Sequence, residues 1–210
     1  MTAVFDEAFW EDLYRARDAI WSGKPNTQLV AEVSDMLPGT ALDVGCGEGA
    51  DTLWLATRGW QVTAVDISPS ALDRARSHAV RVGAEVAGRI TWVHADLTSA
   101  TAMLTSYDLV TAHFMHVPSA QRAHLYGKLA RSVAPGGHLL IVGHHPSDVH
   151  VDHGHEDRSD LLFTTGQVAS TLDPDSWDVL VSEDRERTVA DGEGGKRSLR
   201  DAVVHARRRE

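Results

Sequence analysis

The sequence Ala41-Leu42-Asp43-Val44-Gly45-Cys46-Gly47-Glu48-Gly49 determines the predicted fold. Residues 41–44 are those of a short buried strand, glycine then occupies every second position, and residues 50–58 have apolar side chains at helical spacing. Because glycine has no side chain, a ligand can approach the backbone closely at such a turn. The N–H groups and the positive end of the following helix attract polar or anionic groups. The stretch therefore predicts a strand, a glycine turn and a helix start that together bind a ligand.

A second predicted strand, residues 61–66, ends in an acid. Asp66 follows Gly47 by 19 residues. In a nucleotide-binding βαβ unit, a carboxylate at this position accepts hydrogen bonds from the ribose hydroxyls. Considered alone, the same residues also suit an ordinary turn at 45–49 and a helix cap at Asp66. Both interpretations stay open at this point.

Composition limits the possible partners. The chain has 210 residues with 20 basic and 30 acidic side chains, a net charge of −10, and a pI near 5.6. An acidic surface disfavours nucleic acid and anionic membranes as partners. A single cysteine excludes an internal disulfide and suits a reducing compartment. No basic, apolar signal segment begins the chain, so we expect a cytoplasmic protein. We also expect a monomer or a homodimer.

Strand and helix patterns alternate along the chain, which predicts an α/β fold with a doubly wound, mostly parallel, seven-stranded sheet and an antiparallel C-terminal strand. We expect one domain, 1–210, with a helical cap at 1–38, a core at 39–143, and a loop, short helix and strand pair at 144–210. The further strands are expected at 89–94, 106–112, 138–143, 177–184 and 199–207, and helices at 3–21, 27–37, 69–82, 119–133 and 165–172. Phe5, Phe9, Leu13 and Ile20 would form the buried stripe of the first helix.

The possible nucleoside-binding residues follow successive strands: the turn at 45–49, Asp66, Asp96 and the segment from Thr111. In an open α/β sheet these positions share one crevice beside the topological switch point. The chain here resembles the class I S-adenosylmethionine-dependent methyltransferases. The resemblance covers roughly residues 40–143 and rests on five segments, namely Leu42 to Gly49, Val65-Asp66-Ile67-Ser68, His94-Ala95-Asp96-Leu97, Tyr107-Asp108-Leu109-Val110 and Ala134 to Leu140.

A weaker N-terminal resemblance, through Trp10, Tyr14, Trp21 and Gly23-Lys24-Pro25-Asn26, points to the small-molecule branch near the tellurite-resistance and thiopurine types. The resemblance implies S-adenosyl-L-methionine as cofactor and a small-molecule acceptor. It implies that the turn approaches the methionine part, that Asp66 binds the ribose, and that Ile67 packs on adenine. Asp96 would accept from the adenine amino group, Leu97 would close over the ring, and His113 would line the path to the methyl group. The implied cofactor-binding set is Asp43, Gly45, Cys46, Gly47, Asp66, Ile67, Asp96, Leu97 and His113, and the implied lid and acceptor set is Trp10, Tyr14, Trp21, His144 and His145.

A general base is needed only if the acceptor is protonated at neutral pH. His113 and His116 are the first candidates, and for each a structural or solvated histidine is the alternative interpretation. Residues 144–160 form a polar segment that we interpret as a rim over the acceptor pocket. His150, His153 and His155 with Asp148, Asp152 and Glu156 could hold a transition metal. Closed zinc sites have tighter spacing, so no metal is expected.

Two other functions remain open. Gly45-x-Gly47-x-x-Ala50 fits the dinucleotide-binding fingerprint, and Asp66 would suit NAD, which allows an NAD(P)-dependent reductase. Against it, no Tyr-x-x-x-Lys or comparable hydride-transfer set is present. A non-catalytic protein that binds S-adenosylmethionine is the other alternative.

Overall fold

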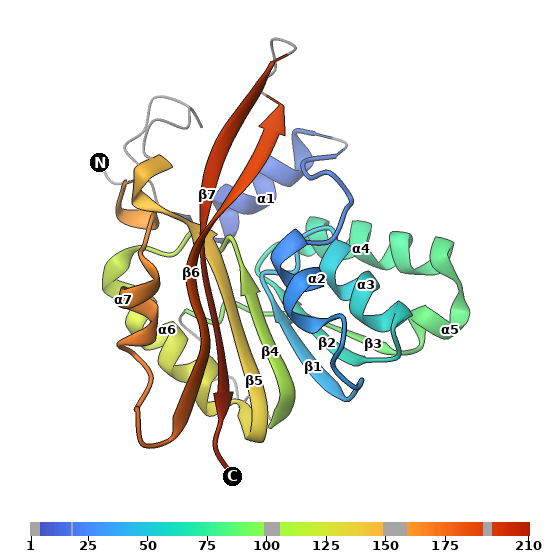
Figure 1. Ribbon diagram of the computed structural model, residues 1–210. Helices are drawn as coiled ribbons and strands as arrows, with labels where there is room; N and C mark the ends of the chain where they lie inside the picture. Colours follow the sequence, from blue (N-terminus) through green and yellow to red (C-terminus); the bar gives the residue numbers. More distant parts are fainter. Residues whose placement is uncertain (1–4, 18, 99–105, 149–158, 191–194) are drawn as a thin grey trace.

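The computed structural model describes residues 5–17, 19–98, 106–148, 159–190 and 195–210. Seven strands form one sheet in the order β3-β2-β1-β4-β5-β7-β6 (Figure 1). The first five strands are parallel, β7 is antiparallel to β5, and β6 is antiparallel to β7. This confirms the predicted fold class. The strands are β1 Thr40–Val44, β2 Gln61–Asp66, β3 Ile90–His94, β4 Tyr107–His113, β5 Val133–His144, β6 Trp177–Ala190 and β7 Lys196–Arg208.

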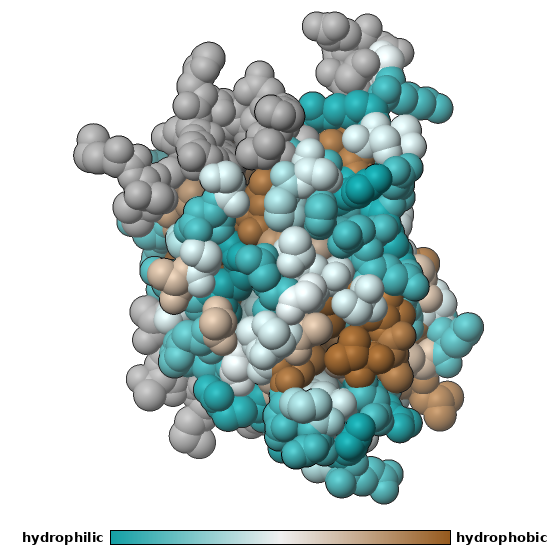
Figure 2. All heavy atoms as spheres, turned by 60° about the vertical axis from the view of Figure 1, so that its left-hand side comes forward, coloured by the Kyte–Doolittle hydropathy of each residue, from teal (hydrophilic) through white to brown (hydrophobic). Residues whose placement is uncertain are grey.

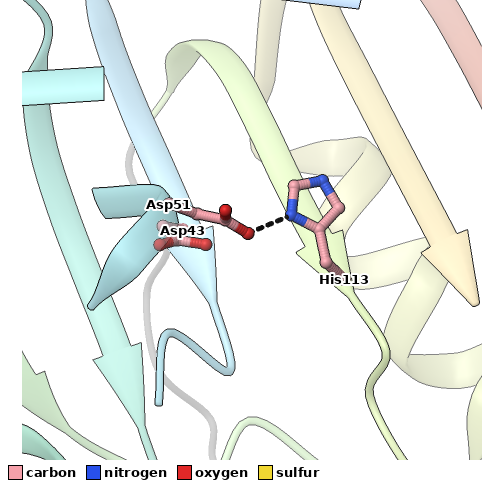
Figure 3. Close-up of side chains that lie close together, drawn as sticks. All are labelled: Asp43, Asp51 and His113. Carbon is pink, nitrogen blue, oxygen red and sulfur yellow. Dashed lines mark hydrogen bonds and ion pairs between the residues drawn. The ribbon is translucent and has the colours of Figure 1, made fainter. Parts of the chain in front are cut away.

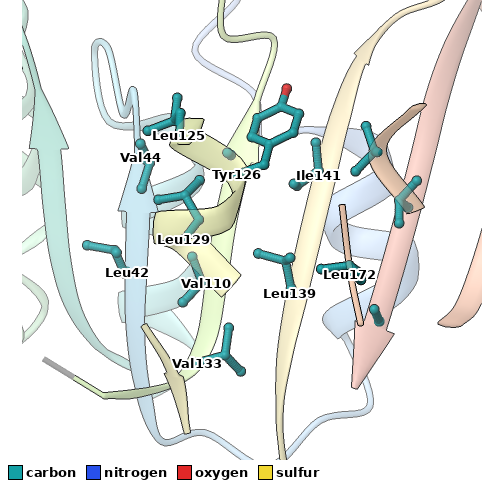
Figure 4. Packing of buried hydrophobic residues seen from close by; sticks show 14 of the residues in the cluster. Leu42, Val44, Val110, Leu125, Tyr126, Leu129, Val133, Leu139, Ile141 and Leu172 are labelled. Atoms are coloured by element: carbon teal, nitrogen blue, oxygen red, sulfur yellow. The ribbon is translucent and has the colours of Figure 1, made fainter. Parts of the chain in front are cut away.

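Helices cover both faces of the sheet. The α-helices are α1 Glu7–Arg15, α2 Thr27–Val33, α3 Ala50–Thr57, α4 Pro69–Val82, α5 Ala84–Ala87, α6 Ser119–Arg131 and α7 Thr165–Ala169, with 3₁₀ turns η1 Pro146–Asp148 and η2 Ser159–Leu161. Alternate residues of β1 point to opposite faces. Ala41 packs in the cluster beneath α2 and α3, whereas Leu42 packs in the cluster beneath α6 and α7. Figure 4 shows the second cluster, in which Leu125 and Leu129 of α6 lie over the strands.

The N-terminal helices are shorter than predicted. Asp6 caps α1 by accepting from the Phe9 N–H, and α1 ends at Arg15, so Ile20 lies outside it. The buried residues of α1 are Glu11 and Tyr14. The predicted buried stripe of Phe5, Phe9, Leu13 and Ile20 was therefore wrong, because the helix turns the carboxylate of Glu11 toward the start of α4. Similarly, α2 ends at Val33 and not at residue 37 as predicted. Leu37, which lies beyond the helix, is 88% exposed.

The residues just before α4 and α6 show how these two helices begin. Ser68 caps α4 through its hydroxyl, which accepts from the Ala71 N–H, and Pro69 occupies the first turn. At α6, Pro118 occupies the cap position without a side-chain hydrogen bond, and Ser119 is the first helical residue. None of the helices in the described part of the chain is both long and apolar enough to span a bilayer.

The C-terminal strands are longer than predicted, and β6 is the outer strand of the sheet. Residues 191–194, between β6 and β7 in the sequence, lie outside the described residues. Figure 2 views the molecule from the side of α6 and α7, where apolar areas, the largest at the lower right, interrupt a mostly polar surface. Val179 and Leu180 of β6 are 45% and 51% exposed, so this edge strand presents apolar side chains to solvent.

Candidate functional site

The ends of the parallel strands bring the predicted cofactor residues to one edge of the sheet. The turn after β1 is bonded directly to β2, since the Gly45 and Cys46 N–H groups both donate to the Val65 carbonyl, at 2.8 and 3.1 Å. Beside this turn, β4 ends at His113, in register with Val142 of β5. The order of the sheet reverses between β1 and β4, so this edge is the topological switch point expected from the sequence.

The glycines of the turn are required by backbone conformation and by space. Gly45, Gly47 and Gly49 have φ angles of +70°, +53° and +85°, a region that side chains disfavour. A Cβ on Gly47 would lie 2.9 Å from the Tyr14 hydroxyl oxygen. A Cβ on Gly49 would lie 2.9 Å from the Cβ of Ala75, so this glycine lets α3 and α4 pack closely. Cys46, which lies between Gly45 and Gly47, is buried. Burial is the main cause that raises the pKa of its thiol, and the charges of Asp43 and Asp66 add to it.

Asp66 links the end of β2 to the turn. Its Oδ2 accepts from the Gly47 N–H at 2.7 Å and its Oδ1 from the Ser68 N–H at 2.9 Å. Burial raises the pKa of this carboxyl, and the two amide donors oppose that rise. Each carboxylate oxygen has a further lone pair and can accept from a ligand hydroxyl. Asp66 is not the cap of α4, because Ser68 fills that position, so the cap interpretation was wrong.

The residues predicted around adenine lie at the ends of β2 and β3. Asp96 is partly buried and accepts through Oδ1 from the Thr98 N–H at 2.8 Å and from the Thr98 hydroxyl at 2.7 Å. Ile67 is partly exposed, and Leu97 is 6% exposed within the core. Asp96 is therefore held in one orientation at the same edge as Asp66, and Leu97 is anchored by packing.

A buried polar cluster joins β1, α3 and β4 beneath the turn (Figure 3). The His113 Nδ1 lies 2.7 Å from Asp51 Oδ2, and Asp43 accepts from the hydroxyls of Thr52 and Thr111. Burial and then the nearby Asp51 charge raise the pKa of Asp43 to about 6. One possible metal-ligating atom from each of Asp43, Asp51 and His113, a carboxylate oxygen or a ring nitrogen, lies within 4.8 Å of the other two. Sequence reasoning missed Asp51, although its place in the first turn after the glycines was a usable signal.

Two of the predicted lid residues, Tyr14 and Trp21, lie against the glycine turn. The Trp21 Nε1 donates to the Tyr14 hydroxyl at 2.9 Å, and Tyr14 is buried whereas Trp21 is 49% exposed. Glu48 of the turn accepts from the Trp21 N–H at 3.1 Å and pairs with Arg74 at 2.8 Å. Sequence reasoning missed Glu48 as the anchor of this segment, although it stands between two of the glycines.

Glu11 is a second anchor that sequence reasoning missed, and it attaches α1 to the start of α4. Its carboxylate accepts from the Ser68 hydroxyl at 2.7 Å and from both the N–H and the hydroxyl of Ser70. Burial opposes ionisation, but the hydrogen bonds from Ser70 and Ser68 outweigh it and lower the pKa of Glu11 to about 2. No local sequence pattern indicated a helix that buries an acid.

The predicted histidines have different surroundings. His116 lies among rings, with its centroid 5.4 Å from Trp10 and 6.0 Å from His144, and so does not share the polar cluster of His113. His144 also lies 4.6 Å from Phe114. His145 bonds to Ser147 and lies 3.5 Å from Asp184 of β6, at the sheet edge.

The predicted metal donors of the polar segment are mostly outside the described residues, namely His150, Asp152, His153, His155 and Glu156. Asp148, which is described, accepts from the Arg200 N–H at 2.6 Å. The rim interpretation of residues 144–160 therefore stays a prediction.

The chain is similar to known methyltransferases in sequence. Residues 41–137 match a family described as a methyltransferase domain. The ubiquinone biosynthesis O-methyltransferase of Alkalilimnicola ehrlichii is 41% identical over 103 residues, covering 48% of this chain and 39% of that protein. An uncharacterized methyltransferase of Mycobacterium tuberculosis is 34% identical over 130 residues, covering 60% of this chain and 61% of the other. The chain spans about half the length of the curated relatives it matches.

Solved structures share the fold over nearly the whole chain. The N-methyltransferase NodS from Bradyrhizobium japonicum, in complex with S-adenosyl-L-homocysteine, superposes with a TM-score of 0.71. The match is 18% identical and covers 98% of this chain and 100% of that one. The chain is therefore similar to methyltransferases in the sequence of residues 41–137 and shares their fold over nearly its whole length, in agreement with the resemblance noted from the sequence.

Proposed function

We propose that this protein transfers the methyl group of S-adenosyl-L-methionine to a small-molecule acceptor. The observation that carries the proposal is the bond between Asp66 and the Gly47 amide, at 2.7 Å, in a turn with no room for a Cβ. This bond brings an acid at the end of β2 and the exposed backbone of the turn together at one crevice. That combination suits a nucleoside with an attached amino acid.

The described residues suit this cofactor. Asp66 retains lone pairs for two ribose hydroxyls, and Ile67 and Leu97 provide apolar contacts for the base. Asp96 would accept from the adenine amino group, and the Gly45–Gly49 backbone would bind the methionine part. S-adenosylmethionine supplies an activated methyl group on a sulfonium that leaves as a neutral thioether.

The protein's remaining task is to align the acceptor and exclude water. Alignment of reactants can contribute roughly 7–11 kcal/mol to lowering a barrier. Trp21 and Tyr14, bonded to each other over Gly47, would cover the crevice. The His116 ring lies 5.4 Å from the ring of Trp10 and 6.0 Å from that of His144, and these three rings would border the acceptor. His113 or His116 would receive the proton of the acceptor where one is lost.

The test is binding followed by turnover. Isothermal titration calorimetry should detect S-adenosyl-L-homocysteine and no binding of NADH, whereas the reverse would support the reductase. Methyl-labelled cofactor should then be incubated with a panel of phenols, thiols, amines and metalloid anions, because the sequence does not identify the acceptor. Transfer to one class identifies the acceptor atom, and binding without transfer to any of them would support the non-catalytic alternative.

The environment of the enzyme is also part of the proposal. The acidic charge and single cysteine favour a cytoplasmic protein without nucleic-acid or membrane partners. A monomer or a homodimer suits a domain of this size, and light scattering of the full chain would distinguish the two.

A further inference from the structure

A continuous row of aromatic rings lies at the edge of the sheet where β4 and β5 end. Its members come from three segments of the chain, namely the start of α1, the loop after β4 and the end of β5. The distances between the centroids of successive rings along the row are 4.8, 5.2, 5.4, 6.0 and 4.6 Å. We call this set the ring row, and in spatial order its members are Phe5, Phe9, Trp10, His116, His144 and Phe114.

The attachment of α1 to the core does not depend on the rings that α1 contributes. Glu11 and Tyr14 are the buried residues of this helix, and the Glu11 carboxylate accepts hydrogen bonds from Ser68 and Ser70 at the start of α4. Phe9 precedes Glu11 by two residues and therefore points to a different side of the helix. All six members of the ring row are partly exposed. A contiguous apolar surface that stays open to solvent is typical of a binding site.

The backbone of Phe114 provides a second, independent observation. Its φ angle is +50°, which no other non-glycine residue in the described part of the chain matches with a positive value. Side chains rarely adopt this conformation, and it persists mainly at ligand-binding sites, where the surrounding structure enforces it. Here the Phe114 N–H donates to the Val142 carbonyl at 2.8 Å. The strained turn leaves His113 in the polar cluster and brings His116 into the ring row.

The far end of the ring row is fixed by the C-terminal hairpin. The guanidinium carbon of Arg187 lies 5.2 Å from the centroid of the Phe114 ring, and its Nη2 lies 3.4 Å from His144 Nδ1. Arg187 is itself held by the buried Asp201, at 2.7 Å. Because both ends of the row are anchored, a ligand that binds there orders few side chains, which favours affinity.

The orientations of the rings suit a flat ligand. The His116 ring is stacked on that of Phe5, at 22°, and tilted by 50° to that of Trp10. An aromatic ligand can therefore meet both the faces and the edges of its neighbours, the two arrangements that aromatic pairs prefer. A puckered aliphatic ring of the same size gains only from the burial of apolar surface.

We propose that the methyl acceptor is a flat aromatic compound that binds with its ring against the ring row, and that Trp10 and His116 determine the specificity for it. The inference rests on the proposed function, which leaves the chemical class of the acceptor open. In the transfer, the bond between the sulfonium sulfur and the methyl carbon breaks, and its electron pair stays on sulfur. A lone pair on an atom that the aromatic compound carries forms the new bond, and any proton on that atom passes to a histidine or to water.

The experiment compares three pairs of compounds that differ only in the ring. The pairs are benzyl alcohol and cyclohexylmethanol, benzylamine and cyclohexylmethylamine, and phenylmethanethiol and cyclohexylmethanethiol. Dissociation constants for the full chain saturated with S-adenosyl-L-homocysteine are measured by ligand-observed NMR titration, and transfer is followed with methyl-labelled cofactor. We expect the benzyl compound to bind about fivefold more tightly than its cyclohexyl partner, because only the flat ring forms aromatic pairs.

Variants of Trp10 test whether the ring row causes this preference. Trp10→Leu and His116→Leu keep an apolar side chain but lose a ring, so the preference should fall below about twofold, whereas Trp10→Phe should retain most of it. The matched control is Trp54→Leu in α3, since Trp54 is also partly exposed but lies beside Arg58, outside the ring row. The control should keep the full preference, and circular dichroism verifies the fold of every variant.

A benzyl preference that is lost in Trp10→Leu and retained in Trp10→Phe and Trp54→Leu would support the proposal. Equal affinity for the two rings, binding of neither, or an equal loss for both rings in Trp10→Leu would overturn it. Transfer of labelled methyl groups to cyclohexyl compounds as fast as to benzyl compounds would also overturn it, while leaving the proposed function intact. Failure of the protein to bind S-adenosyl-L-homocysteine would instead reject the proposed function and, with it, this inference.

Discussion

Two sides of the sheet edge use acidic residues differently. On the turn side, formed by β1, β2, α3 and α4, Asp43 and Asp66 accept from hydroxyl and amide groups without a basic side chain as partner. On the hairpin side, formed by β5, β6 and β7, charges pair with charges. Arg187 lies 2.7 Å from Asp201, and Arg185 lies 2.6 Å from Glu32 of α2. Asp43 and Asp66 of the turn side therefore keep negative charge available for a ligand. The acids of the hairpin side, and Glu48 of the turn through its pair with Arg74, hold elements together.

The same contrast predicts which variants impair stability and which impair binding. Variants of the hairpin side should unfold the protein more easily and leave the affinity of the folded molecules for S-adenosyl-L-homocysteine intact. Variants of the turn side should weaken the affinity for S-adenosyl-L-homocysteine and leave the free energy of unfolding nearly unchanged.

The largest effect on stability is expected for Gly143→Ala in β5. A Cβ at this position would overlap the ring of the buried Phe163, so the core must shift. Overpacking of this kind costs about 3 kcal/mol of unfolding free energy, which urea denaturation would measure. The matched control is Gly127→Ala in α6, where a Cβ meets only the end of Arg131 at 3.6 Å. It should gain about 0.5–1 kcal/mol from helix propensity, and equal effects of the two would contradict the packing argument.

Glu32→Gln should cost about 2 kcal/mol of stability at pH 7, because it removes the charge partner of Arg185 and weakens the hydrogen bond with the buried His205. Despite burial, hydrogen bonds from His205 and Arg185 lower the pKa of Glu32. The contribution is therefore present above the ordinary glutamate pKa and is lost as the pH falls through the lowered value. Wild type and variant should converge in stability once the pH has fallen below this lowered pKa. A reduced affinity of folded Glu32→Gln for S-adenosyl-L-homocysteine would contradict the prediction that hairpin-side variants change stability alone.

Asp66→Ala should weaken the binding of S-adenosyl-L-homocysteine by at least tenfold, which corresponds to about 1.4 kcal/mol or more, because two hydrogen bonds to a charged group are lost. Calorimetry measures the affinity, and thermal unfolding tests whether the fold persists. An unchanged affinity would reject the placement of the ribose at the end of β2.

Trp21→Ala should have the smallest effect, a rise of roughly threefold in the KM for cofactor or acceptor, or about 0.7 kcal/mol. It removes the bond to Tyr14 over the glycine turn, while the half-exposed side chain contributes little to the core. Leu37→Ala, at a position that is 88% exposed, is the control for a surface truncation. Unchanged kinetics in Trp21→Ala would show that this segment packs beside the site without covering it.

Much of the turn side was predictable because its signals are local. Glycines with positive φ, the acid after β2, and the Ser68-Pro69 helix start are read over a few residues. The hairpin was predicted as a strand pair, but its full length and its ion pairs with α2 were not. Those contacts join residues about 150 or more positions apart, such as Glu32 with Arg185 and His205, and no local pattern records them.

The sequence by itself determined the sheet class, the glycine turn and the position of Asp66, because backbone conformation and strand ends depend on near neighbours. Only the tertiary structure decided that Asp51 meets His113, that Glu48 and Glu11 anchor the N-terminal segment, and that His116 lies apart from the polar cluster. The physical reason is that charge balance in a buried site depends on which side chains meet across elements, and that becomes defined only when the chain has folded.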